Sequence, residues 1–167
     1  MEAQEKEKIL GDLRSGRTTL LAVLSDMTED FAARIPAPGK WSVLEFVEHL
    51  AVSEDYLFSQ INVSQHSDVS MLNRQREALI VARGLDRTRM VQSPEVGIPT
   101  GRFATLSDAL RHFLESRERT IRFVENCTDD LRAGLTSHPI IGIVNCCEIL
   151  LADSSSSLSE RKTNRRD

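Results

Sequence analysis

Four histidines, His49, His66, His112 and His138, are the side chains in this sequence best suited to binding a metal ion. A helix offers two imidazoles to one ion when they are four residues apart, because positions i and i+4 lie on one face. No two of these histidines have that spacing. The pattern therefore places His66, His112 and His138 on the surface or in turns. His49 lies ~120° from the centre of its helix's apolar stripe, so periodicity predicts a solvated edge position.

Three cysteines, Cys127, Cys146 and Cys147, form no C-x-x-C pair. An odd count with two adjacent members is a poor disulfide framework, so we interpret them as buried thiols, with metal or redox chemistry as the alternative. The net charge of −4 offers no basic surface to nucleic acid or anionic lipid. No apolar run approaches the ~20 residues that cross a bilayer, and the N-terminus has no signal-peptide pattern. We therefore expect a cytoplasmic protein with no nucleic-acid or membrane partner.

The elements that position these residues are expected to be helices of a single domain. A chain of 167 residues can bury one core. Apolar residues recur at helical spacing in four segments, which predicts helices over residues 3–33, 42–62, 105–126 and 142–154. Ser42 and Glu45 form a capping box at the start of the second helix.

The segments between and after these helices complete the predicted organisation. Residues 63–104 form a long connection, in which NRQREALIVARG could form a short helix. Four serines follow the fourth apolar segment and favour fraying, so residues 1–153 are expected to form the domain and residues 154–167 a polar, disordered tail. The predicted fold class is all-α: a four-helix bundle with a long connection between the second and third helices. The four helices are expected to run antiparallel or nearly so, without a sheet of three or more strands.

Three segments resemble, in order and spacing, the signature of the DinB-like family. PAPGKWSVLEFVEHLAVSEDYL contains the Gly-Lys-Trp-Ser turn, a His-Leu pair that begins at His49 and a following Glu, Glu54. The stretch PTGRFATLSDALRHFLESRERTIRFVENCTDDLR is similar to the family's third-helix region, and SHPIIGIVNCCEILL is similar to its His-Pro turn and last helix. The resemblance covers most of residues 5–151.

The resemblance implies a divalent metal, Zn, Ni or Fe, held by three histidines: one from the second helix and an H-x-x-x-H pair from the fourth. It also implies metal-assisted hydrolysis, or transfer of a low-molecular-weight thiol to an electrophile. His49 matches the first ligand position. The pair falls on Ser156 and Glu160 without a gap, or on Leu158 and Lys162 after a two-residue shift, and none of these is a histidine.

Three hypotheses follow from the incomplete ligand set. The first is a metal-dependent hydrolase or thiol S-transferase that uses His49 and recruits ligands from elsewhere. The second is a non-catalytic helical bundle that acts through homodimerisation or small-ligand binding, or is an eroded gene product. In the third, the last dozen residues come from a shifted reading frame or a mutated gene.

Periodicity makes one further prediction, which does not depend on the family. Glu54 lies ~20° from the centre of the second helix's apolar stripe, and Arg117 has a similar position on the third. A charge in such a position is normally paired, because an isolated buried ion costs several kcal/mol. We therefore predict that Glu54 and Arg117 form an ion pair across the bundle, with Arg17 as the competing partner.

Overall fold

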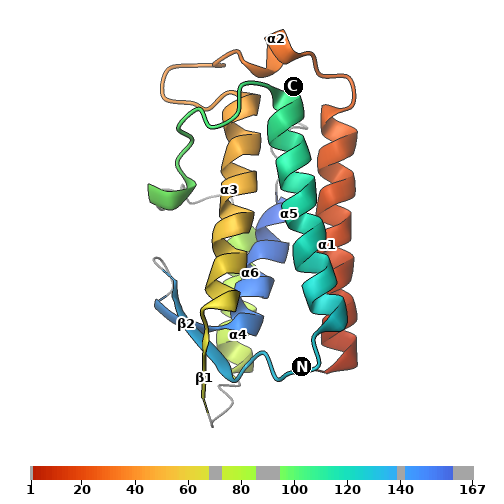
Figure 1. Ribbon diagram of the computed structural model, residues 1–167, viewed down its shortest axis with the longest axis vertical. Coiled ribbons are helices and arrows are strands. Elements are labelled where there is room, and N and C mark those ends of the chain that lie inside the picture. The colour runs from red at the N-terminus through yellow and green to blue at the C-terminus, as the bar shows by residue number, and fades with distance from the viewer. Residues whose placement is uncertain (1, 68–72, 86–94, 139–141, 160–167) are drawn as a thin grey trace.

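Four long helices lie side by side in the computed structural model (Figure 1). The structure describes residues 2–67, 73–85, 95–138 and 142–159, and the side chains of 84, 85 and 154–159 are excepted. The predicted four-helix bundle is confirmed. Its helices are α1 (Ala3–Leu24), α3 (Val43–Asn62), α5 (Leu106–Asn126) and α6 (Cys146–Ser159).

The direction of the helices differs from the expected antiparallel arrangement. In Figure 1, α3 and α5 both run from the end of the molecule that carries α2 toward the end that carries the strands, so these neighbours are parallel. The long connection after α3 returns the chain to the first end before α5 begins. Periodicity predicts which face of a helix is buried but carries no information on its direction.

The long connection contains two short helices. α4 (Arg74–Leu85) confirms the predicted short helix and packs against α6. The 3₁₀ helix η1 (Glu95–Gly97) lies against α3. The connection therefore contributes to the packing of two bundle helices.

The prediction of one helix over residues 3–33 is wrong at its end. α1 ends at Leu24, and α2 (Glu29–Ala32) begins after a turn. The Thr28 hydroxyl accepts the Phe31 N–H and caps this new helix. The turn also places the Glu29 side chain at the N-terminal end of α5. Its carboxylate accepts the N–H groups of Leu106 and Ser107, the first residues of that helix, at 2.6 and 3.0 Å.

The expectation that the chain would contain no three-stranded sheet is also wrong. β1 (Gln65–His66), β2 (Gly134–His138) and β3 (Gly142–Asn145) form an antiparallel sheet in the order β1-β2-β3. β3 occupies the first four residues of the segment predicted as the fourth helix. The β-branched pair Ile143 and Val144 favours this extended conformation.

A capping box fixes the start of α6 four residues later than predicted. The Asn145 side chain accepts the Glu148 N–H at 2.9 Å, and the Glu148 carboxylate accepts the Asn145 N–H at 3.0 Å. The helix continues to Ser159, so its backbone includes the four serines that were expected to fray. Residues 160–167 lie outside the described residues, and the predicted domain boundary after residue 153 stays a prediction.

The core has two clusters, one at each end of the bundle. The cluster near the sheet contains side chains of α1, α3, α5 and α6, among them Leu13, Ile61 and Ile149. The cluster near α2 contains side chains such as Leu20, Val47 and Phe113. Glu54 and Arg117 lie along α3 and α5 between these clusters.

Candidate functional site

Glu54 and Arg117 form the predicted ion pair in the middle of the bundle. Arg117 Nη2 lies 2.7 Å from Glu54 Oε2, and each side chain is 2 % exposed. The competing partner, Arg17, pairs instead with Glu118 near the surface. The prediction from periodicity is therefore confirmed.

A third charged group, Asp153 of α6, also contacts Arg117. Arg117 Nη1 and Nη2 donate to the two Asp153 carboxylate oxygens at 3.0 and 3.1 Å, a bidentate arrangement. Burial and the neighbouring Asp153 carboxylate raise the pKa of Glu54 to about 8, although Arg117 opposes this shift. One buried arginine thus faces two carboxylates, and we call these three residues the triad.

The sequence contained a signal for Asp153. It follows Cys146, Ile149 and Leu150 at the spacing i+7, i+4 and i+3, which places it on the buried stripe of α6. The predicted domain boundary falls at this residue, because four serines follow it.

His49 faces the long connection rather than solvent. Its Nδ1 lies 2.6 Å from the Gly97 carbonyl oxygen of η1, and its ring centroid lies 5.0 Å from that of Trp41. A Cβ on Gly97 would lie only 3.1 Å from His49 Nδ1, so glycine is needed for this close approach. Burial lowers the pKa of His49. A neutral ring that donates from Nδ1 to the carbonyl carries its lone pair on Nε2.

The residue before His49 holds the other side of the same connection. The buried Glu48 carboxylate accepts backbone N–H groups from Thr100, Gly101 and Arg102 at 2.7, 3.2 and 3.2 Å. Glu48 and His49 therefore fasten the connection to α3 at two points. Sequence analysis missed Glu48, because a glutamate beside a candidate ligand gives no local signal of a distant loop.

The other three histidines lie away from His49 and from one another. His112 Nε2 lies 2.6 Å from Asp55 Oδ2 in a half-exposed pair. His66 is exposed on β1, and His138 ends β2. Burial alone would raise the pKa of Asp55. Hydrogen bonds from His112, Ser116 and Arg119 outweigh burial and lower this pKa. His66 and His112 thus lie at or near the surface as expected, whereas His138 is half-buried in a strand and burial lowers its pKa.

The donor set does not fit a three-imidazole metal centre. Within residues 2–67, 73–85, 95–138 and 142–159, no three His, Cys, Asp or Glu side chains come together in a way that could hold a metal ion. The two alternative ligand pairs from sequence fall on residues whose side chains are not described: Ser156, Leu158, Glu160 and Lys162.

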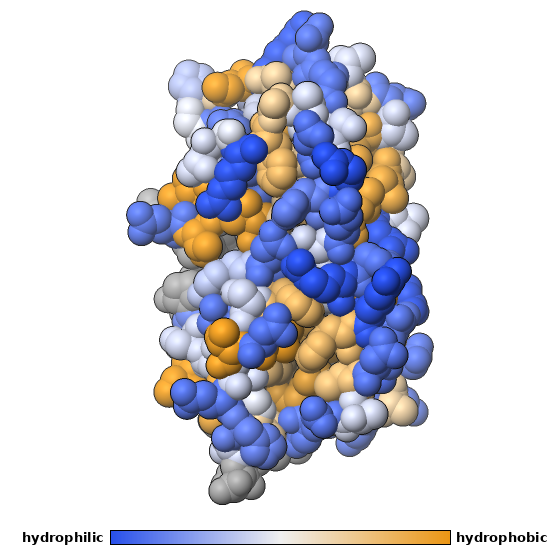
Figure 2. Space-filling model, in the orientation of Figure 1, coloured by the Kyte–Doolittle hydropathy of each residue, from blue (hydrophilic) through white to orange (hydrophobic). Residues whose placement is uncertain are grey.

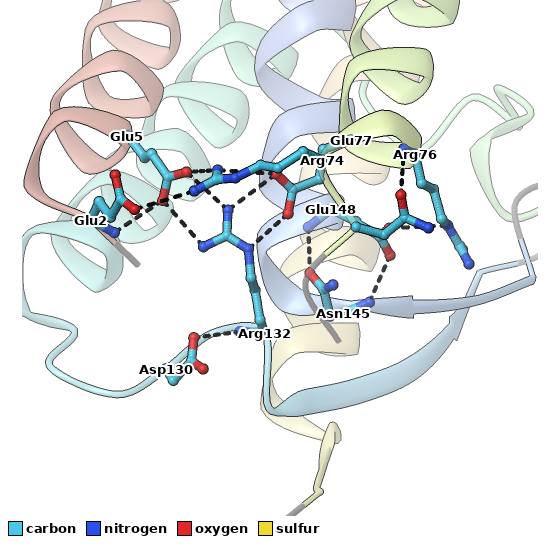
Figure 3. A network of polar contacts seen from close by, with 10 residues as sticks. Glu2, Glu5, Arg74, Arg76, Glu77, Asp130, Arg132, Asn145 and Glu148 are labelled. Atoms are coloured by element: carbon cyan, nitrogen blue, oxygen red, sulfur yellow. Dashed lines mark hydrogen bonds and ion pairs between the residues drawn. The ribbon is translucent and has the colours of Figure 1, made fainter. Parts of the chain in front are cut away.

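A second polar cluster, near the N-terminus, joins α1, α4 and the loop before β2 (Figure 3). Arg132 donates from Nε and Nη2 to Glu77 at 2.7 and 3.1 Å, and from Nη1 and Nη2 to Glu5 at 3.1 Å each. Arg74 lies beside both glutamates. Every carboxylate here has a cation, and the arrangement fastens α4 to α1.

Two of the depressions on the described part of the molecule are lined by residues other than His49. One, of about 410 Å³, lies between the end of α1 and α2, and its lining includes Met27 and Phe31. The other, of about 190 Å³, includes His66, Cys127 and Cys146. Cys146 and Cys147 are buried free thiols as expected, whereas Cys127 is half-buried. Burial raises the pKa of both buried thiols, that of Cys147 to about 11.

The face formed by α5 and its neighbours is mixed in character. Figure 2 shows polar side chains across this face, with apolar side chains between them in several separate groups. No helix within the described residues is long and apolar enough to span a membrane.

The protein is a helical bundle with buried charged groups at its centre. Residues 12–146 match the profile of the DinB superfamily, which covers well over half of the chain. The protein therefore belongs to the DinB superfamily. The match ends at Cys146, where α6 begins.

A solved structure with a similar fold is YfiT from Bacillus subtilis, described as a probable metal-dependent hydrolase with an unusual four-helix bundle topology. The similarity has a TM-score of 0.60 and covers 95 % of this chain and 83 % of YfiT. At 16 % sequence identity, it shows the fold alone. A search of curated proteins finds no relative of this chain.

Proposed function

We propose that this protein is a DinB-family helical bundle that acts by binding, either a small molecule or a second copy of itself, and not by metal-dependent catalysis. The observation that carries the proposal is the distribution of its four histidines. His49 is near the connection, His112 pairs with Asp55, and His66 and His138 lie on the sheet. A tight site for Zn, Ni or Fe needs several fixed imidazole or thiolate donors, which this arrangement does not supply. The composition favours a cytoplasmic location.

Metal-dependent hydrolysis or thiol transfer is the second candidate function. Two observations favour it: YfiT is described as a probable metal-dependent hydrolase, and the Nδ1 contact of His49 resembles the second-shell hydrogen bond of a metal-bound histidine. In this case, a divalent metal would take His49 Nε2 and further donors from residues 154–167 or from a second copy.

Titration of the metal-free protein with Zn²⁺ distinguishes the two functions. The binding function predicts no Zn²⁺ site with a sub-micromolar dissociation constant and no metal bound after purification. Sub-micromolar binding that His49→Ala abolishes would favour the hydrolase. His112→Ala serves as the matched control, because His112 lies on α5 and pairs with Asp55, whereas His49 contacts η1.

The helix geometry favours one of the two ligand registers. Glu54 and Asp153 both contact Arg117, so they lie at about the same height on antiparallel helices. Since each residue advances a helix by ~1.5 Å, the five-residue step back from Glu54 to His49 corresponds to the step forward from Asp153 to Leu158. Position 158 is midway between 156 and 160, which supports the ungapped register.

Restoring the histidines tests the scaffold directly. The double variant Ser156→His, Glu160→His should gain Zn²⁺ affinity, and adding His49→Ala should remove it. The matched control is Leu158→His, Lys162→His, which should gain less. Equal affinity in both double variants would contradict the register.

A further inference from the structure

The formal charges of the triad do not balance. Arg117 carries one positive charge, whereas Glu54 and Asp153 carry two negative charges when both are ionised. The side chains of Arg117 and Glu54 are 2 % exposed and that of Asp153 is 10 % exposed. Water therefore screens the excess negative charge poorly, and a buried uncompensated ion is costly.

Other charged groups on the surrounding helices are engaged elsewhere. On α3, Asp55 faces His112, Ser116 and Arg119 on the outer side of α5. Several cations on these helices pair as follows: Arg14 and Arg17 of α1 with Glu125 and Glu118, Arg122 of α5 with Glu118, and Arg74 and Arg76 of α4 with Glu5 and Glu148. Arg117 is thus the cation that the described part of the bundle directs at Glu54.

The two carboxylates use Arg117 differently. Asp153 receives both guanidinium hydrogen bonds. Glu54 lies 2.7 Å from Nη2, and the buried Thr120 hydroxyl of α5 also faces it and favours its ionised form. Contact with Asp153 favours the protonated form of Glu54, because a carboxylic acid can donate to a neighbouring carboxylate.

We propose that Glu54 keeps its proton beside the Asp153 carboxylate in the folded protein at neutral pH, and that release of this proton at mildly alkaline pH loosens the second half of α6 from the bundle. The triad then works as a pH-sensitive switch. With the proton, one cation balances one anion. Without the proton, Glu54 and Asp153 repel each other across the contact between α3 and α6. Asp153 lies on α6, so the repulsion acts on that helix.

The raised pKa of Glu54, about 8 against an ordinary 4.5, sets the direction of the pH dependence. Between these values the folded state binds a proton that the unfolded state has lost. The stabilisation is therefore complete below about 4.5 and is lost as pH rises through about 8. One such proton lowers the ratio of folded to unfolded protein by about tenfold per pH unit within this window.

The direct test is carbon NMR of the full chain with ¹³C-labelled glutamate, with the Glu54 signal assigned by its loss in Glu54→Gln. We expect the Glu54 carboxyl to titrate between about pH 7 and 9 in the wild type. In Asp153→Asn the neighbouring negative charge is absent while Glu54 stays buried, so the Glu54 carboxyl should titrate at a lower pH than in the wild type. A Glu54 signal that is already ionised at pH 6 in the wild type would overturn the proposal.

Amide hydrogen exchange tests whether the second half of α6 loosens from the bundle. The Asp153 amide should lose at least about tenfold more protection between pH 7 and 9 in the wild type than in Glu54→Gln, which carries a permanently neutral isostere. An amide near the middle of α1, such as that of Leu13, should show no difference between the two proteins. Equal pH dependence of Asp153 protection in the two proteins would refute the loosening of α6. If Glu54→Gln does not fold, Asp153→Asn provides the same comparison.

Discussion

Two buried arginines in the described part of the chain each face two carboxylates, but their environments differ. Arg132 makes four hydrogen bonds to Glu5 and Glu77, and Arg74 lies beside both glutamates as a second cation. Arg117 has two hydrogen bonds to Asp153 and a close contact with Glu54. Two arginines therefore face Glu5 and Glu77 in the cluster around Arg132, whereas among the described side chains one arginine faces both Glu54 and Asp153.

This difference separates an ionic cluster that holds elements together from one that responds to protons. In the cluster around Arg132, Glu5 and Glu77 are each hydrogen-bonded to a guanidinium, and these bonds join α1 to α4. In the triad, burial and like charge favour a protonated Glu54. The two clusters can be compared by removing each arginine in turn.

Removal of Arg117 should have the largest effect on stability. Arg117→Met leaves Asp153 buried without the cation that it contacts twice, which typically costs about 3–5 kcal/mol. Urea unfolding monitored by circular dichroism measures the change in the free energy of unfolding. A loss below about 1 kcal/mol would show that solvent reaches the triad.

Replacement of all three members should be much milder than removal of Arg117. Apolar residues at Glu54 and Arg117 alone would leave Asp153 largely buried and charged without its cation. The triple variant Glu54→Leu, Arg117→Met, Asp153→Leu removes every charge, and such replacements are often neutral or stabilising. The double variant that keeps Asp153 should be less stable than the triple variant in the same urea experiment.

Removal of Arg132 should cost less than removal of Arg117. Arg132→Met leaves Arg74 beside Glu5 and Glu77, and the Glu5 side chain is 19 % exposed. We expect a loss of about 1–3 kcal/mol, concentrated in the docking of α4. Amide exchange in α4 should increase more than in α5. A larger loss than for Arg117→Met would contradict the role assigned to Arg74.

Much of the fold followed from the sequence because apolar periodicity locates helices well. The predicted ranges 42–62 and 105–126 agree with α3 and α5 within one residue. The parallel direction of these two helices did not follow, because it depends on where a connection of 42 residues, 63–104, returns the chain. The small sheet did not follow from the sequence because each strand has five residues or fewer, and residues 142–145 continue directly into the apolar segment of α6.

Members of the candidate site could be predicted only where the position of a charged residue on its helix shows that it is buried and needs a partner. Glu54 and Arg117 were found because a charge on an apolar stripe needs a partner. The contact between His49 and Gly97 joins residues 48 positions apart, and no local pattern indicates it. Asp153 lay on an apolar stripe as well, but the serines that follow it suggested the end of the helix.

A methyl group at Gly97 should disturb the contact between His49 and the connection. The added Cβ would lie 3.1 Å from His49 Nδ1 and 3.3 Å from Ser53 Oγ, so these side chains must move. Gly97→Ala should cost about 1–2 kcal/mol in urea unfolding. Gly11→Ala is the matched control, since nothing lies within 4 Å of its Cβ and alanine stabilises a helix by about 0.5–1 kcal/mol relative to glycine. A neutral Gly97→Ala would show that the connection shifts freely.

The smallest expected effect comes from protonation of His49, whose sign is opposite to that of Glu54. Burial lowers the pKa of His49 below 6.5, so the folded state resists a proton that the unfolded state accepts. The stabilisation from the neutral ring is therefore present above about 6.5 and is lost as pH falls through the lowered pKa. His49→Asn keeps a donor near Nδ1 but does not titrate. We expect the wild type to lose stability relative to this variant between about pH 7 and 5, by less than about 1 kcal/mol because the ring is only partly buried. Nitrogen NMR of the imidazole should show the proton on Nδ1, and a proton on Nε2 instead would mean that the Gly97 carbonyl does not hold the ring.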